Sequence, residues 1–157
     1  MEIRSRAGFP AGTLSNFSPH AFELDGVQIA SMEGFLQSLK FENPHEQAEV
    51  CKLVGSSAKK RGRAKPLLWS QQTFYWKGAA FKRDSVEYQE LLDRAYSALC
   101  SQSEEFRRAL LATGDAALKH SMGRTKACET VLTKAEFCSR LIKLRRELQD
   151  QKGLLQF

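Results

Sequence analysis

No apolar run in this 157-residue chain approaches the roughly 20 residues that a membrane-spanning helix needs. The first residues, MEIRSRAGF, are polar and lack the apolar stretch of a secretion signal. Cysteine is scarce, and its four residues form no CxxC pair and have no histidine at metal-binding spacing (Cys51, Cys100, Cys128 and Cys138). We therefore predict a cytoplasmic protein with reduced thiols, and neither a metal site nor a cofactor.

The motifs of several enzyme classes are also absent. The sequence contains no GxSxG, HExxH, P-loop or GxGxxG pattern, and so gives no signal for serine hydrolases, zinc proteases or the common phosphate-binding loops. The three histidines, His20, His45 and His120, are scattered, and we interpret each as structural or exposed. Candidate chemistry is therefore sought among carboxylates, amides and cations.

The charge is unbalanced. Lysine and arginine outnumber aspartate and glutamate by 24 to 18, which gives a net charge of +6 and a pI near 9.3. A basic surplus is compatible with a polyanionic partner, because each phosphate that is neutralised releases condensed counterions. Many basic proteins bind no nucleic acid, so the charge alone does not identify the partner.

The fold class follows from turn and capping signals. Asp25-Gly26, between the short apolar-rich runs of 22–29, predicts a two-residue β-hairpin. The rest of the chain reads mainly as helix, and capping signals predict helices starting after Ser31, Asn43, the Asp84-Ser85 pair, Ser101 or Ser103, and Thr133. We predict one compact domain over residues 1–157, mainly α with a small N-terminal β-hairpin.

The segment SMEGFLQSLKF, residues 31–41, holds polar residues in an apolar helix. Glu33, Gln37 and Lys40 share one stripe of this helix. Spacing alone favours a solvent-exposed stripe, since a glutamate is stabilised near a helix N-terminus and Glu/Lys faces are usually hydrated. The alternative is that these side chains line a site.

Two further segments carry candidate binding residues. Residues 56–66 place five cations around Gly62, including Arg61 and Arg63, and can be either a solvated loop or a phosphate site. Residues 67–81 are rich in aromatics, which more often fill a core than stack on a base.

Three of these features together resemble the NADAR (YbiA-like) family. They are LSNF at 14–17, the DG hairpin, and the S-x-E-x-x-x-Q-x-x-K-F pattern at 31–41. The likeness continues more faintly through most of the chain, to the terminal RLIKLRREL at 140–148. Membership implies a mostly helical domain that cleaves N-glycosidic bonds without a metal. The substrates known for the family are ribosyl phosphates of aminopyrimidines from the riboflavin route and ADP-ribose attached to guanine in DNA.

The resemblance also implies roles for individual residues. Glu33 corresponds to the active-site glutamate, and the other matching positions are implied to bind substrate: Asn16, Phe17, Gln37, Lys40, and either Trp69 or Trp76. From the residues themselves, we add the cations Arg61 and Arg63 as phosphate ligands.

The chain departs from the family pattern at two places. Gly34 stands where the family has a histidine, and residues 118–133 lack the acidic and Trp-Gly motif of the family's C-terminal segment. Asp115 and Glu129 are the nearest candidates for a second acid.

These observations support three hypotheses. The first is an N-glycosidase that removes ADP-ribose from guanine in DNA, which would reverse a DNA-modifying toxin; the alternative substrate is a phosphorylated aminopyrimidine. The second is a module that binds ADP-ribose without cleaving it. The third is a helical protein that binds nucleic acid through its basic charge.

Overall fold

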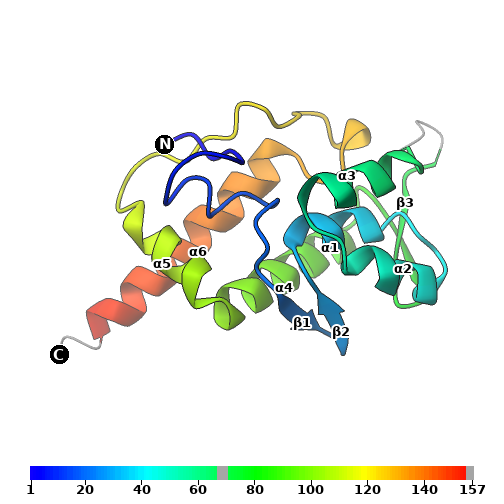
Figure 1. Cartoon of the computed structure of the whole chain (residues 1–157), viewed down its shortest axis with the longest axis horizontal. Helices are drawn as coiled ribbons and strands as arrows, with labels where there is room; N and C mark the ends of the chain where they lie inside the picture. The colour runs from blue at the N-terminus through cyan, green and yellow to red at the C-terminus, as the bar shows by residue number, and fades with distance from the viewer. Residues whose placement is uncertain (67–70, 155–157) are drawn as a thin grey trace.

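The computed structural model describes residues 1–66 and 71–154, which form an α-rich domain with two small antiparallel hairpins (Figure 1). The strands are β1 (Phe22–Leu24), β2 (Val27–Ile29), β3 (Thr73–Trp76) and β4 (Ala79–Lys82). The α-helices are α1 (Met32–Ser38), α2 (Pro44–Cys51), α3 (Gly55–Arg63), α4 (Val86–Gln102), α5 (Glu104–Ala112) and α6 (Lys134–Leu154), with a short 3₁₀ helix at Ala127–Glu129. The predicted fold class is confirmed.

The first hairpin has the predicted turn. Asp25 and Gly26 both adopt positive φ angles, 52° and 81°, and Leu24 pairs with Val27 directly beside them. A turn of this kind matches the right-handed twist of the two strands.

The second hairpin was not predicted, because residues after the first hairpin were read mainly as helix. Its turn is Lys77-Gly78, with φ angles of 50° and 89°, and Trp76 pairs with Ala79 across it. The backbone N–H of Tyr75 donates to the carbonyl of Leu39 at 2.9 Å, which attaches β3 to the end of α1. The aromatic side chains Phe74 and Trp76 are therefore brought into the core by strand β3 and not by a helix.

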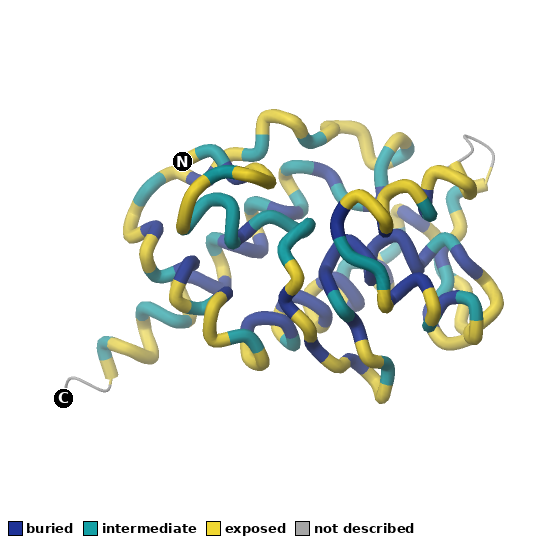
Figure 2. The backbone as a smooth tube through the Cα atoms, viewed as in Figure 1, coloured by how far each residue is buried: buried dark blue, intermediate teal, exposed yellow. Residues whose placement is uncertain are grey.

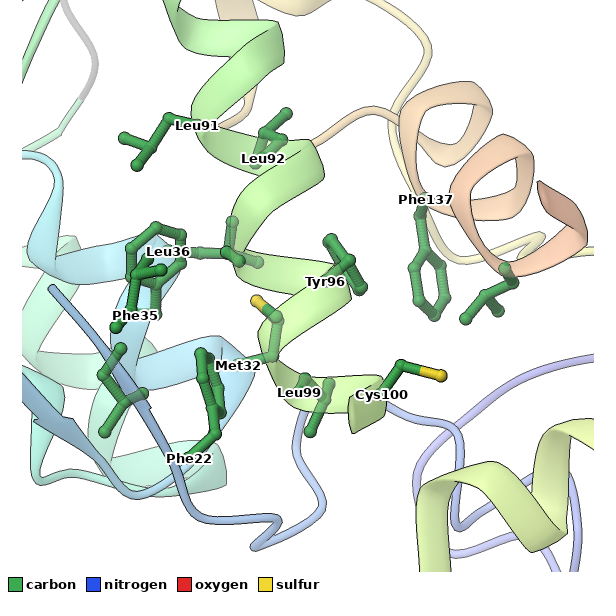
Figure 3. Close-up of a cluster of buried hydrophobic side chains, with 14 of the residues drawn as sticks. Phe22, Met32, Phe35, Leu36, Leu91, Leu92, Tyr96, Leu99, Cys100 and Phe137 are labelled. Carbon is green, nitrogen blue, oxygen red and sulfur yellow. The ribbon is translucent and has the colours of Figure 1, made fainter. Parts of the chain in front are cut away.

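Helix α1 lies at the centre of the molecule, and all seven of its residues are buried. Its N-cap is Ser31, whose hydroxyl accepts from the N–H of Gly34 at 3.0 Å, as predicted. Phe35 and Leu36 point into a core cluster with residues of α4, as Figure 3 shows. The expectation of a solvent-exposed polar stripe is wrong, because Glu33 and Gln37 are buried and Lys40 is half-buried.

Four of the five remaining α-helices of the described residues, α2, α4, α5 and α6, begin at predicted caps. Asn43, Ser85 and Ser103 each accept a hydrogen bond from a backbone N–H of the first turn of α2, α4 and α5. At the start of α6, Thr133 and Glu136 form the reciprocal bonds of a capping box, 2.8 and 3.1 Å long. The exception is α3, whose N-cap Val54 supplies no side-chain bond.

The N-terminal segment and the loop of residues 115–133 are held together and cross one face of the molecule (Figure 1). The N–H of Ile3 donates to the carbonyl of Lys119 at 2.7 Å, and the N–H of Lys119 donates to that of Met1 at 2.9 Å. Most of the loop between residues 121 and 129 is exposed (Figure 2). Segments more than 110 residues apart thus meet beside α1.

Candidate functional site

A cavity of about 620 Å³ opens between α1, α3, the N-terminal segment and the 120–133 loop. We call it the Glu33 cavity, and its volume lies in the range of about 300–1,000 Å³ that is typical of small-molecule sites. Its polar lining includes Arg4, Asn16, Glu33, Gln37, Lys40, Lys59, Arg63, His120, Arg124 and Glu129.

Glu33 is the buried carboxylate of this cavity, with 9% of its surface exposed. Burial raises the pKa of Glu33, while the Gln37 hydrogen bond and the charges of Lys59 and Lys40 oppose that rise. Gln37 donates from Nε2 to Glu33 Oε1 at 2.9 Å, and the backbone N–H of Glu33 donates to the carbonyl of Asn16 at 3.0 Å. A carboxyl group with a raised pKa in a cavity is suited to proton transfer.

Helix α3 closes one side of the cavity at very short range. A Cβ atom on Gly62 would lie 1.8 Å from Gln37 Oε1, so only glycine allows this approach. The carbonyl of Gly62 also accepts from Lys40 Nζ at 3.2 Å. The pKa of Lys40 is lowered by burial, and the negative charge of Glu33 offsets only part of this effect. The close packing of α3 therefore fixes both polar neighbours of Glu33.

The NF pair of LSNF also reaches the cavity. Tyr96 donates its hydroxyl proton to Asn16 Oδ1 at 2.8 Å, which leaves the Asn16 amide group as a donor for a ligand. Phe17 lines the cavity, and Lys59 Nζ lies 5.8 Å from its ring centroid. Phe17 is thus an aromatic surface on which a base can stack.

Cations surround the entrance. Arg4 comes from the N-terminal segment, Lys59 and Arg63 from α3, and Arg124 from the loop. Glu129 also lines the cavity, but it is exposed and lies 3.9 Å from Arg124 Nη1. The surroundings of Glu33 are therefore cationic, which suits a phosphorylated ligand.

The structure places three predicted site residues away from the Glu33 cavity. Arg61 forms an ion pair with Glu46 at 2.6 Å and lies over the Phe41 ring. Trp76 is buried and donates its indole proton to Asp25 Oδ2 at 2.8 Å. Asp115 is exposed in the turn after α5. These residues do not line the cavity, and Trp69 lies outside the described residues.

The cavity also contains residues that the sequence did not single out. Arg4 carries no motif of its own, Arg124 stands in segment 118–133 about where the family pattern has acids, and His120 is interpreted from the sequence as structural or exposed. The sequence signal for Arg124 and His120 is their place in segment 118–133, which departs from the family pattern, and Arg4 has no signal of its own. The pairing of Ile3 with Lys119 brings them together.

Gly34, the departure within the α1 motif, has a steric cause. A Cβ atom there would lie 2.5 Å from the carbonyl oxygen of Leu53 and 3.2 Å from that of Cys51. The end of α2 thus packs directly on α1, and a histidine side chain has no room at this position in this chain.

Across residues 1–66 and 71–154, no group of three or more His, Cys, Asp or Glu side chains is arranged to hold a metal ion. No helix in this part of the chain is long and apolar enough to cross a membrane.

Comparison with solved structures identifies the fold class. The NMR structure of the E. coli protein YbiA superposes with a TM-score of 0.64, covering 97% of this chain and 86% of that one. The identity is 21%, so the likeness shows a shared fold. The protein is thus a helical domain with the YbiA-like fold that the NADAR resemblance predicted. It carries a buried glutamate in a basic cavity.

Sequence comparison identifies the family. The model of the family described as Bacteriophage protein GP30.3 matches residues 8–146, and the chain belongs to that family. A 17.1 kDa protein in the Gp30-rIII intergenic region of Enterobacteria phage T4 is 39% identical over 150 residues, covering 94% of this chain and 98% of the relative.

Proposed function

We propose that the protein is an N-glycosidase that removes ADP-ribose from guanine bases in DNA without a metal ion. The observation that carries the proposal is Glu33: a buried carboxyl group with a raised pKa that lines a cavity rich in cations. The YbiA-like fold supports a glycosidase-type role.

Glycosidic cleavage passes through a transition state in which positive charge develops on the sugar. The Glu33 carboxylate would stabilise that charge and accept a proton from the attacking water. Gln37 holds one carboxylate oxygen by its hydrogen bond, and the Asn16 amide would donate to a ribose hydroxyl. Phe17 would stack on the leaving base.

The distribution of cations supports a substrate with several phosphates. Arg4, Lys59, Arg63 and Arg124 line the same cavity, whereas a pyrimidine with a single phosphate would engage fewer of them. The net charge of +6 favours an extended polyanion such as DNA.

The test is to incubate the protein with two substrates and measure the products by chromatography. One is an oligonucleotide that carries ADP-ribosylated guanine, and the other is a ribosyl phosphate of an aminopyrimidine. We expect ADP-ribose from the first, loss of activity in Glu33→Gln, and full activity in the control Glu90→Gln, which changes an exposed glutamate of α4. Cleavage of the pyrimidine alone would overturn the choice of substrate.

A module that binds ADP-ribose without cleaving it is the second candidate. It is favoured by Glu129, which is exposed and faces Arg124 and so gives the cavity no buried second carboxylate. Calorimetry that shows tight binding of ADP-ribose, with no turnover of either substrate, would establish this alternative.

A further inference from the structure

His120 lies in the Glu33 cavity, in the loop that replaces the expected acidic segment. Its side chain is half-buried, and its ring packs edge-on against Phe137 with centroids 5.3 Å apart and an interplanar angle of 83°. It also interacts electrostatically with Glu33. The imidazole and the carboxylate thus belong to one site, although 87 positions separate them in the sequence.

The hydrogen bond of His120 determines which nitrogen is left for a ligand. Nδ1 lies 2.7 Å from the carbonyl oxygen of Ile3, and since a carbonyl oxygen only accepts, Nδ1 carries a proton. Nε2 has no hydrogen-bond partner among residues 1–66 and 71–154. One ring nitrogen is thus held by a backbone carbonyl and the residue lines the cavity, an arrangement that orients a histidine for proton transfer.

The surrounding loop holds the ring in place. A Cβ atom on Gly123 would lie 2.7 Å from His120 Cδ2 and 2.8 Å from Lys134 Cβ, so the loop folds over the ring only with glycine there. The N–H of Ser121, the next residue, donates to Glu2 Oε1 at 2.7 Å, and the preceding residue, Lys119, is bonded through its backbone to Met1 and Ile3. The backbone on both sides of His120 is therefore anchored.

We propose that His120 is the catalytic acid that protonates the departing base, an inference that rests on the proposed function. The imidazolium donates its Nε2 proton to the guanine nitrogen as the bond from that nitrogen to the anomeric carbon of the attached ADP-ribose breaks, and the bonding electron pair leaves with the base. Water adds to the same anomeric carbon and passes its proton to Glu33. Solvent then takes the proton from Glu33 and returns one to His120, so the reaction consumes one water.

The charged groups around His120 are compatible with this role. Glu33 on α1 and Glu2 on the N-terminal segment are carboxylates that interact with it electrostatically. Lys134 at the start of α6 packs its Cβ near the ring, and Arg124 lines the same cavity. Glu129 faces Arg124 and is exposed, so it competes poorly for the role of acid.

The test compares substrates that differ in their need for a proton. We would measure turnover of ADP-ribosylated guanine in DNA and of 4-nitrophenyl ADP-ribose, whose phenolate departs unprotonated, with the wild type, His120→Asn and Glu33→Gln. An asparagine amide can still donate to the carbonyl of Ile3 but has no group at the position of Nε2. Melting temperature and ADP-ribose affinity confirm that the variant is folded.

We expect His120→Asn to slow release from guanine by a factor of 100 or more and to change 4-nitrophenol release by less than tenfold. The same variant should lose one limb of the pH–rate profile for the guanine substrate, while Glu33→Gln slows both substrates. Equal slowing of both substrates by His120→Asn, or unchanged release from guanine, would overturn the role of His120 alone. If the wild type releases nothing from either substrate, the proposed function fails and this inference fails with it.

Discussion

At the residue scale, Glu33 is placed where a charge is unfavourable. Its carboxyl group is almost fully buried, and burial raises its pKa. A folded-state pKa above the unfolded value means that ionisation opposes folding: the cost is absent at low pH and grows as pH rises through the folded pKa. Because the buried Glu33 carboxylate lowers the stability of the fold, its presence is better explained by a role in catalysis than by a role in folding.

The first prediction is therefore that Glu33→Gln increases the free energy of unfolding at pH 8. A glutamine keeps an oxygen that can accept from Gln37 Nε2 but carries no charge to desolvate. Urea titrations at pH 8 and pH 4 should show the gain at pH 8 and little difference at pH 4. A loss of stability at pH 8 would show that the carboxylate contributes to folding instead.

The second prediction concerns the contact between α3 and Gln37. Gly62→Ala would place a Cβ atom 1.8 Å from Gln37 Oε1, which must displace the amide that holds Glu33. We expect a loss of about 1–3 kcal/mol in stability from overpacking and at least a tenfold loss of turnover. Gly153→Ala in α6 is the control, because a Cβ atom there meets nothing within 4 Å. Unchanged turnover in Gly62→Ala would mean that the amide does not position Glu33.

At the element scale, the predicted helices are those with side-chain caps. Asn43, Ser85, Ser103 and Thr133 each carry their signal in adjacent residues, and the structure confirms all four. Helix α3 has no such cap and was read as either a basic loop or a phosphate site. The second hairpin was missed because Lys77 at a positive φ is a weak turn signal.

The third prediction concerns the anchor between α6 and the end of β4. Arg83 Nη2 lies 2.6 Å from Glu136 Oε1, and both side chains are largely buried. Burial alone would raise the pKa of Glu136, but hydrogen bonds from Arg83, Gln89 and the N–H of Thr133 outweigh it and lower the pKa to about 2. A lowered pKa stabilises the fold above the ordinary value of 4.5, and this contribution is lost as pH falls towards 2.

Glu136→Gln should therefore lower the free energy of unfolding by about 3 kcal/mol at pH 7. The difference from the wild type should shrink between pH 4.5 and pH 3. Denaturant titrations across this range measure it, with Glu147→Gln as the control at an exposed position of the same helix. A deficit that does not depend on pH would contradict the account of this ion pair.

At the scale of the whole molecule, the site is assembled from segments far apart in the chain. The motif of residues 31–41 predicted Glu33, Gln37 and Lys40 together because they are close in sequence: the first two lie on α1, and Lys40 lies two residues after its end. Arg4 and His120 could not be found in this way, since the backbone pairing between residues 1–3 and 119 brings them to the cavity. Local patterns predict residues within an element, but they do not predict which loops will close over it.

The fourth prediction follows from the distribution of charge around the cavity. Binding of modified DNA should weaken as salt rises, and Lys59→Ala or Arg63→Ala should each reduce the slope of log K against log salt by about one. Lys152→Ala is the control, because it lies near the far end of α6 (Figure 1). Fluorescence anisotropy at several salt concentrations gives the slopes. If Lys152→Ala reduced the slope by the same amount, DNA binding would not be specific to the cations of the cavity.

The most direct test of the central claim is single-turnover release of ADP-ribose from modified DNA by the wild type and Glu33→Gln, together with calorimetry of ADP-ribose binding. We predict that Glu33→Gln binds ADP-ribose at least as tightly as the wild type but releases it from DNA at least 1,000-fold more slowly. A Glu33→Gln variant with near-wild-type release would contradict the claim that the buried glutamate of α1 is the catalytic group.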